Sequence, residues 1–488
     1  MQRCRVWLHR PPRARDAPWV AVALALWAAV WLLMLASTSL SPPVDNVEQL
    51  TWVRTLAWGY YKHPPLPTFL LWPLVQVFGL HEWVASLAGA LTIVTALFVC
   101  WRLTSELRGA KMAGLATLGT LCITYYSGRT YYYNHNMVLL PLVAGAAWCC
   151  WRAFRDRSLP AWLGVGTMLG LGALAKYQVG LAVASLLFFW WSQRGWRDPL
   201  HRRGLAGAAL VAGLIFVPHG LWLVTHDFAP LHYAMRTSLG TALSAGHRLL
   251  HSLNWLGDQI GRMAPALLLG TGLLAWTRWR PNPAPPPAPP APSPDVVSVF
   301  LFSWGLLPLV LIALLGVLIG AELQLQWGTA FVPLTCAWLM EQAPRGRWRQ
   351  LRWRDALLGF AAVQIMLATF SWATSPMGPQ ALVIHHNRNF PSQALADQLG
   401  PAARAALGGP IEVIAGPAQL AEALALRLPE RPLVLIDGRI DFSPWIAPDR
   451  LARQRVLWVG GPGELPPAGA VPHMLPGALW WAARKSAD

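Results

Sequence analysis

Long apolar segments alternate with short polar ones over the first three quarters of the chain. Apolar runs of about 20 residues are typical of helices that cross a lipid bilayer. The pattern predicts about eleven such helices, several of them short and rich in glycine. They are expected at residues 19–40, 83–103, 111–127, 137–151, 160–175, 178–192, 205–224, 263–277, 296–320, 327–341 and 355–374.

The segment 41–82, between the first two apolar runs, has a different pattern. Apolar residues recur every three or four positions from Val47 to Tyr60, which predicts an amphipathic helix lying on the bilayer surface. His63 stands before two prolines, which are expected to end that helix. The next 16 residues, 65–80, contain three prolines. They predict a second interfacial or re-entrant helix, because the stretch is too short and broken for a span.

From about residue 377 the hydropathy drops and short strand-like and helix-like segments alternate. Strands are expected at 381–386, 411–416, 432–438 and 455–461, and helices at 391–407 and 418–428. This alternation predicts a small α/β domain of about 110 residues at 377–488. The preceding domain, 1–376, contains a Pro/Ala tract at 281–294, which predicts an extended linker without catalytic residues.

Composition and charge support a membrane protein rather than a set of soluble domains. Hydrophobic residues make up 55% of the chain and mean hydropathy is +0.38. The net charge of +17 would favour nucleic acid only if it formed one face, and the arginines instead lie in small clusters between apolar runs. With the N-terminus in the cytoplasm, 22 of the 39 Lys and Arg residues fall on the inner side and seven in outer loops. This charge bias predicts a cytoplasmic linker at 281–294 and puts 41–82 and 377–488 on the outer side.

A cleaved signal peptide is the alternative interpretation of residues 1–40. The apolar run there is about 22 residues long and SPPVDN follows it, without a small-x-small cleavage site. These features favour a retained first span.

Titratable groups cluster where the apolar pattern breaks, and charges at a membrane boundary often have a chemical role. Each cluster also has an alternative explanation without a chemical role. The tyrosines can belong to an aromatic belt, Lys176 can snorkel to the interface, and Glu322 can be a simple boundary carboxylate. The groups with candidate roles are Asp45, Glu48, Arg54, Lys62 and His63 in the outer segment, Arg129, His135 and Asn136 in the turn at 127–136, Lys176 between two apolar runs, and Glu322.

These residue types suit the transfer of a sugar from a lipid phosphate carrier. Such a reaction needs a general base for the acceptor hydroxyl and a cationic site for the departing phosphate. Asp45 is the candidate base, and Lys62, His63, Arg54 and Lys176 are candidate phosphate ligands. No GxGxxG or P-loop motif starts a helix, and the donor's own phosphate makes a bound nucleotide unnecessary.

Several motifs together carry a resemblance to a known family. They are Asp45 after the first span, GYYKHPPL at 59–66, NHNMVLLPL at 134–142, ALAKYQ at 173–178, the QWGTAFVPL turn, and SPWI at 443–446. In this order they resemble the GT-C membrane glycosyltransferases, specifically the bacterial family 39 type related to protein O-mannosyltransferases and to the aminoarabinose transferase acting on lipid A.

The resemblance implies an inverting glycosyltransferase of the bacterial inner membrane, with its C-terminal domain in the periplasm. Its donor would be a sugar linked to polyprenyl phosphate, and its acceptor a lipid, a glycan or a protein. It would also contact membrane lipids but no nucleic acid, and a divalent metal is possible as a cofactor. The resemblance maps the catalytic base to Asp45. The expected substrate- and phosphate-binding residues are Glu48, Arg54, Tyr61, Lys62, His63, Arg129, His135, Asn136, Lys176, Tyr177 and Glu322.

Two positions depart from the family pattern. Asn46 follows Asp45 where the family often has a second acid, and Asn136 stands where many members have an aspartate. These amides favour one alternative, an inactive scaffold with the same fold. The other alternative is a lipid or solute transporter, which would be expected to have charges near the midplane and inverted repeats.

Overall fold

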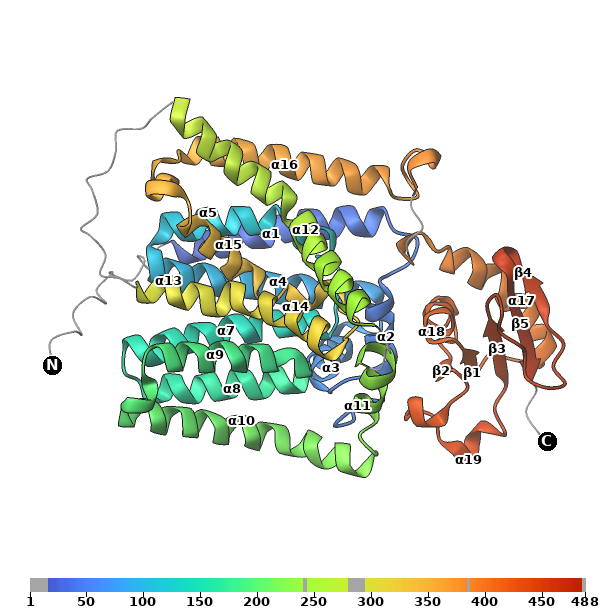
Figure 1. Cartoon of the computed structure of the whole chain (residues 1–488). Coiled ribbons are helices and arrows are strands. Elements are labelled where there is room, and N and C mark those ends of the chain that lie inside the picture. The colour runs from blue at the N-terminus through green and yellow to red at the C-terminus, as the bar shows by residue number, and fades with distance from the viewer. Residues whose placement is uncertain (1–15, 240–243, 280–294, 384–386, 485–488) are drawn as a thin grey trace.

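The computed structural model describes residues 16–239, 244–279, 295–383 and 387–484. Most of the chain forms a bundle of roughly aligned helices, and the C-terminal residues form a small α/β unit at one end of it (Figure 1). Three short helices lie between the bundle and this unit: α2 Val44–Trp52, α3 Leu66–Phe78 and α11 Ala229–Ala234 (Figure 1). The predicted class, a polytopic helical membrane protein with a small C-terminal α/β unit, is confirmed.

The bundle helices follow the apolar pattern of the sequence. Their bounds are α1 Ala17–Ser37, α4 Glu82–Arg108, α5 Ala110–Leu121, α6 Thr124–Gly128, α7 His135–Arg155, α8 Leu159–Ala175, α9 Gly180–Ser192, α10 Pro199–Thr225, α12 Ala245–Trp279, α13 Val296–Leu301, α14 Leu307–Ile319, α15 Val332–Glu341 and α16 Trp353–Ala373. A π-helical turn at Phe302–Leu306 joins α13 to α14.

Each of the eleven predicted spans overlaps at least one of these helices. Within the described residues, six helical segments are long and apolar enough to cross a membrane, which makes the chain a multi-pass membrane protein. Others are shorter than predicted: α5 has 12 residues and α15 has 10. The span predicted at 263–277 is the second half of α12, a helix of 35 residues. The count of eleven therefore stays a prediction, and the linker at 281–294 lies outside the described residues.

The outer segment 41–82 differs from its predicted form. Helix α2 covers Val44–Trp52, whereas the sequence predicted a helix continuing to Tyr60. The chain turns after Trp52, and backbone hydrogen bonds in both directions between Tyr60 and His63 close a tight turn before the prolines. Every residue from Asn46 to Trp52 is buried within the protein, and the position of this helix on the bilayer surface stays a prediction. The second predicted helix is present as α3, Leu66–Phe78.

The C-terminal unit contains a five-stranded sheet in the order β2-β1-β3-β5-β4. Strands β2, β1 and β3 are parallel, and β5 and β4 are antiparallel to their neighbours. The elements of this unit are α17 Ser392–Leu407, β1 Val413–Gly416, α18 Ala418–Arg427, β2 Leu433–Ile436, α19 Pro448–Leu451, β3 Val456–Gly460, β4 His473–Leu475 and β5 Leu479–Arg484.

Predicted and observed strands agree for β1, β2 and β3, as do the helices α17 and α18. The strand predicted at 381–386 is not formed in its described part, where Gln380–Leu382 is a short 3-10 helix; 384–386 lie outside the described residues. Strands β4 and β5 were missed, since proline and glycine interrupt the sequence around them.

Helix α18 packs directly on α2 and thereby brings the C-terminal unit to the outer segment. Arg427 forms an ion pair with Glu82 at 3.0 Å. Arg54 donates a hydrogen bond of 3.0 Å to the carbonyl of Arg431, and Arg431 donates to the carbonyl of Leu80. Polar contacts therefore join the C-terminal unit to residues 54 and 80–82 of the outer segment, which also carries the candidate base.

A second close approach holds the turn at 130–133 against α4. Gly89 lies so near this turn that a Cβ atom there would be 2.0 Å from the carbonyl oxygen of Tyr132. Only glycine permits such contact between a helix and a neighbouring backbone. The turn is thus fixed between α4 and α2, and it carries the chain into α7 beside Asp45.

Candidate functional site

Asp45 lies in the first turn of α2, where a carboxylate also interacts favourably with the helix dipole. Its side chain is half-buried and its Oδ2 accepts a hydrogen bond of 2.7 Å from the amide of Asn134. Asn134 is itself the N-cap of α7, with its Oδ1 accepting from the backbone N–H of Met137. The orientation of the candidate base is therefore set by a helix cap, a role of Asn134 that the sequence did not reveal.

Asn46 has a structural role that an aspartate could not fill. Its Nδ2 donates to the carbonyl of Tyr131 at 2.8 Å and its Oδ1 accepts from the N–H of Tyr133 at 2.7 Å. The side chain is completely buried. A carboxylate has no N–H to donate, so the amide suits this position. Asn46 therefore joins α2 to the turn at 130–133 by two hydrogen bonds. This role gives a structural reason for an amide at a position where the family often has an acid.

Glu48 and Lys62 form an ion pair of 2.6 Å, with only 6% of the Glu48 side chain exposed. Burial raises the pKa of Glu48, although Lys62 opposes that shift. For Lys62, burial lowers the pKa, but Glu48 and other neighbours, including Asp45, more than offset it, so the net shift is upward. Lys62 therefore keeps a positive charge near Asp45.

Lys176 lies between the end of α8 and the 3-10 turn Tyr177–Val179, so it is outside the apolar helices α8 and α9. It donates a hydrogen bond of 2.5 Å to the Oδ1 of Asn136. Burial lowers its pKa to about 8, while the nearby Asp45 opposes the shift. The ammonium groups of Lys176 and Lys62 are close enough to disfavour each other's charge. Two lysines and Asp45 thus lie in one region, and their roles as phosphate ligands and base stay predictions.

Two histidines occupy the same region. The rings of His63 and His135 have centroids 4.0 Å apart, and His135 donates from Nε2 to the carbonyl of Pro64. Burial, followed by the neighbouring His135, holds the pKa of His63 well below its usual value. A neutral imidazole can donate or accept a hydrogen bond but gives a phosphate no positive charge.

The same histidines and Glu48 form a group that can hold a metal ion. Ligand atoms of Glu48, His63 and His135 all lie within 4.8 Å of one another. Two imidazoles and a carboxylate are a donor set that divalent transition metals accept. A metal there would compete with Lys62 for the Glu48 carboxylate.

Two tyrosines brace the loop after α2. Tyr177 donates from its hydroxyl to His219 at 2.8 Å, and His219 donates in turn to the carbonyl of Trp58 at 2.6 Å. Tyr61 stacks on Phe442 of the C-terminal unit with centroids 4.0 Å apart. Both tyrosines therefore support the loop that carries Lys62.

Three predicted residues lie apart from this cluster. Arg54 is engaged with the carbonyl of Arg431, as described above. Glu322 is exposed, and its backbone N–H donates to Ser238. Arg129 lies over the ring of Tyr132, 4.3 Å from its centroid, and lines a separate cavity of about 180 Å³.

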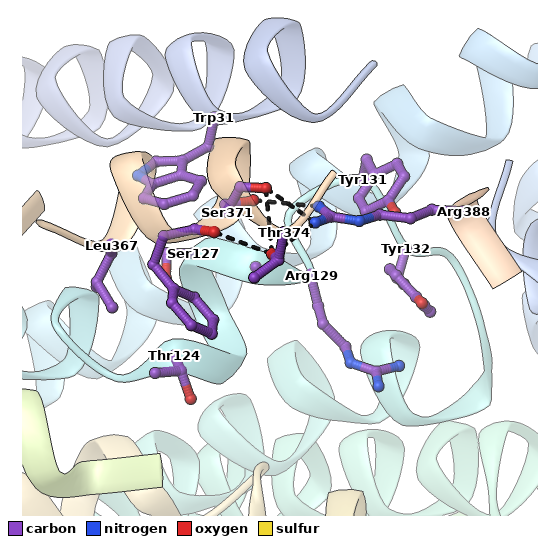
Figure 2. Close-up of a pocket in the computed structure, with 12 residues that line it drawn as sticks. Trp31, Thr124, Ser127, Arg129, Tyr131, Tyr132, Leu367, Ser371, Thr374 and Arg388 are labelled. Carbon is purple, nitrogen blue, oxygen red and sulfur yellow. Dashed lines mark hydrogen bonds between the residues drawn. The ribbon is translucent and has the colours of Figure 1, made fainter. Parts of the chain in front are cut away.

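That cavity lies between α1, α6 and α16 (Figure 2). Trp31 and Leu367 give it an apolar wall, and Arg388 reaches in from the chain after α16 to hydrogen-bond Ser371 and Thr374 (Figure 2). The guanidinium of Arg129 points away from that of Arg388 (Figure 2). The two arginines therefore do not form one anion site.

The sequence also missed Glu422 of α18, which is buried at the contact with α2. Glu422 is the only charged residue in the segment LAEALAL at 420–426. A lone carboxyl within an apolar run was the signal that could have identified it.

Comparison with known proteins gives a consistent picture. The model of the dolichyl-phosphate-mannose-protein mannosyltransferase family matches residues 62–222. The lipopolysaccharide core galacturonosyltransferase RgtB of Rhizobium johnstonii is 27% identical over 219 residues, 44% of each chain. The lipid A galacturonosyltransferase RgtD of the same organism is 23% identical over 54% of this chain and 53% of its own. The chain thus spans about half the length of the curated relatives it matches.

Two solved structures share the fold over almost the full length. ArnT from Cupriavidus metallidurans superposes with a TM-score of 0.65 in its apo state, at 17% identity over 96% of this chain and 98% of that one. The same protein bound to undecaprenyl phosphate gives 0.65 at 18% identity and the same coverage. The resemblance to the GT-C, family 39 type that the sequence indicated is therefore confirmed, with the fold as its firmest part.

The role of Asn46 generates a stability prediction. Asn46→Asp removes the amide donor to the Tyr131 carbonyl and buries a carboxyl, so it should lower the free energy of unfolding by about 1–3 kcal/mol. A thermal melt of the detergent-solubilised protein should show a clear decrease in Tm, and Asp397→Asn on the exposed face of α17 is the control. A variant Asn46→Asp as stable as the wild type would contradict the fastening role.

Proposed function

We propose that this multi-pass membrane protein, which has the GT-C fold and resembles the family 39 glycosyltransferases, is an inverting glycosyltransferase. It moves a hexosyl or pentosyl group from a polyprenyl-phosphate carrier to an acceptor hydroxyl of a lipid, glycan or protein. The reaction takes place at the periplasmic face of the bacterial inner membrane, with the N-terminus in the cytoplasm. The observation that supports this most strongly is the convergence of Asp45, Lys62 and Lys176 beside α2.

In this proposal Asp45 is the general base. Its carboxylate takes the proton of the acceptor hydroxyl, and the acceptor oxygen forms a bond to the anomeric carbon of the sugar. The bond from that carbon to the phosphate oxygen breaks, and polyprenyl phosphate leaves with the electron pair. A single displacement of this kind inverts the anomeric configuration.

The two lysines stabilise the charge that develops on the departing phosphate. An ammonium held beside a phosphate oxygen in a site shielded from water contributes more than it would in water. Glu48 holds Lys62 in place by the 2.6 Å ion pair, and Asn136 holds Lys176. The neutral Asn136 thus has a positioning role in this proposal.

The remaining predicted residues support these groups. Tyr61 and Tyr177 fix the loop that carries Lys62, and Arg54 links that loop to the C-terminal unit. His63 and His135 offer hydrogen bonds to the sugar, or ligands to a divalent metal together with Glu48. The other two predicted residues, Arg129 and Glu322, are proposed to contact the acceptor or lipid at the edge of the site.

The domain division of the proposal is 1–376 for the membrane domain and 377–488 for the periplasmic α/β domain. Segment 41–82 carries the site, and the linker at 281–294 is cytoplasmic. A polyprenyl-phosphate donor agrees with ArnT having been solved with undecaprenyl phosphate bound. The proposed sugar transfer also agrees with the two similar galacturonosyltransferases and with the mannosyltransferase family whose model matches residues 62–222.

Asp45→Asn tests the base. The amide keeps the shape of the side chain and its contact with Asn134 but cannot take a proton, so transfer should fall about 10²–10⁴-fold. Membranes carrying each variant are supplied with radiolabelled polyprenyl-phosphate sugars, and labelled acceptor is counted. Asp397→Asn should transfer as the wild type does. Undiminished transfer by Asp45→Asn would refute the base assignment. If the wild-type protein transferred sugar from no donor but moved a solute or lipid across the membrane, a transporter would be favoured.

The pKa of Lys176, lowered to about 8 by burial, gives a pH dependence. As the pH rises through 8 the lysine loses its proton, so kcat/KM for the donor should fall above that pH. Lys176→Arg keeps the charge and should move this decline to higher pH. The measurement is a pH profile of kcat/KM for both proteins between pH 6 and 10. A decline that Lys176→Arg leaves unchanged would exclude Lys176 as its source.

A further inference from the structure

Glu422 of α18 has a buried carboxyl group. Its residue is 1% exposed. Neither carboxyl oxygen has a hydrogen-bond partner among the described residues. A buried polar group without a hydrogen bond destabilises the fold, so such groups are uncommon unless water or a ligand supplies the missing bond.

The position of Glu422 ties it to the candidate site. Helix α18 packs on α2, and Glu422 interacts electrostatically with Glu48, Lys62 and Asp45 of the candidate site as well as with Asp437 of its own unit. Burial, followed by the nearby Glu48, raises the pKa of Glu422 well above its usual value. A protonated carboxyl can both donate and accept a hydrogen bond, as a sugar hydroxyl can.

The geometry of a single displacement shows which part of the substrate lies there. The acceptor oxygen, the anomeric carbon and the phosphate oxygen are roughly in line during transfer. The sugar therefore occupies the space between the base, Asp45, and the phosphate ligand, Lys62. A side chain that is close to both of them is close to the sugar ring.

We infer that Glu422 is a sugar-binding residue that the C-terminal unit contributes to the site, with its carboxyl hydrogen-bonded to a ring hydroxyl of the transferred sugar. The inference rests on the proposed function, because it uses the roles given there to Asp45 and Lys62. If Glu422 binds the sugar, the C-terminal unit helps to determine which sugar the protein transfers. The arrangement also explains why α18 is fastened to the outer segment by Arg427 and Arg431.

Two substitutions separate sugar binding from a structural role. Glu422→Leu has a similar size and removes the unpartnered polar group, so it should leave Tm unchanged or raise it. If the carboxyl binds the sugar, the same variant should raise the donor KM about tenfold, the loss of one hydrogen bond of about 1.4 kcal/mol. Glu422→Gln still donates and accepts and should stay within about threefold of the wild type.

The experiment measures Tm, donor KM and kcat for both variants, with Asp45→Asn assayed in parallel. A second readout uses donors that lack one sugar hydroxyl. The wild type should discriminate against one of these deoxy donors by about tenfold, and Glu422→Leu should not discriminate against it. An unchanged KM in Glu422→Leu, or equal discrimination against every deoxy donor by both proteins, would overturn the inference.

The same experiment distinguishes failure of the inference from failure of the proposed function. Transfer by the wild type, loss in Asp45→Asn and no effect of Glu422→Leu would overturn only the role of Glu422. No transfer by the wild type from any polyprenyl-phosphate sugar would overturn the proposed function, and the inference with it. A loss in Glu422→Gln as large as in Glu422→Leu would also contradict it, because a neutral hydrogen-bonding group should suffice.

Discussion

Lys62 and Glu48 hold the loop after α2 against that helix by an ion pair largely removed from water. Removing one partner of such a pair leaves a buried charge and typically costs about 3–5 kcal/mol. The ion pair is therefore needed to hold the loop against α2. The same loop contains the tight turn between Tyr60 and His63 and the two prolines that follow it. The bundle on one side and α18 on the other keep this pair from solvent.

Because buried charges are costly, the charged groups Asp45, Lys62 and Lys176 each have a hydrogen-bond partner. Asn46 joins α2 to the turn before α7, Asn134 orients Asp45, and Asn136 holds Lys176. The two positions at which this chain has an amide in place of a family acid, Asn46 and Asn136, both have specific partners. Each amide therefore has a structural role of its own, and the inactive scaffold stays an alternative that the transfer assay tests.

The sequence predicted the membrane helices and the α/β unit well because apolar runs and alternating segments are local signals. It also identified Asp45, Lys62 and Lys176, which stand out as charges between apolar runs. It failed where tertiary contacts decide. The periodicity from Val47 to Tyr60 predicted one amphipathic helix, but the helix ends at Trp52, the chain turns at Val53, and packing against α18 accompanies burial of its polar residues. Glu422 lies more than 350 residues from Asp45 in sequence, so no local pattern could associate them.

The most direct test of the account is an experimental structure of the protein with polyprenyl phosphate bound. The account predicts the phosphate oxygens about 3 Å from the ammonium groups of Lys62 and Lys176, with the Asp45 carboxylate on the side of the phosphate where the sugar would lie. Phosphate bound elsewhere, for example in the cavity beside Arg388, with both lysines left in their present pairs, would contradict it.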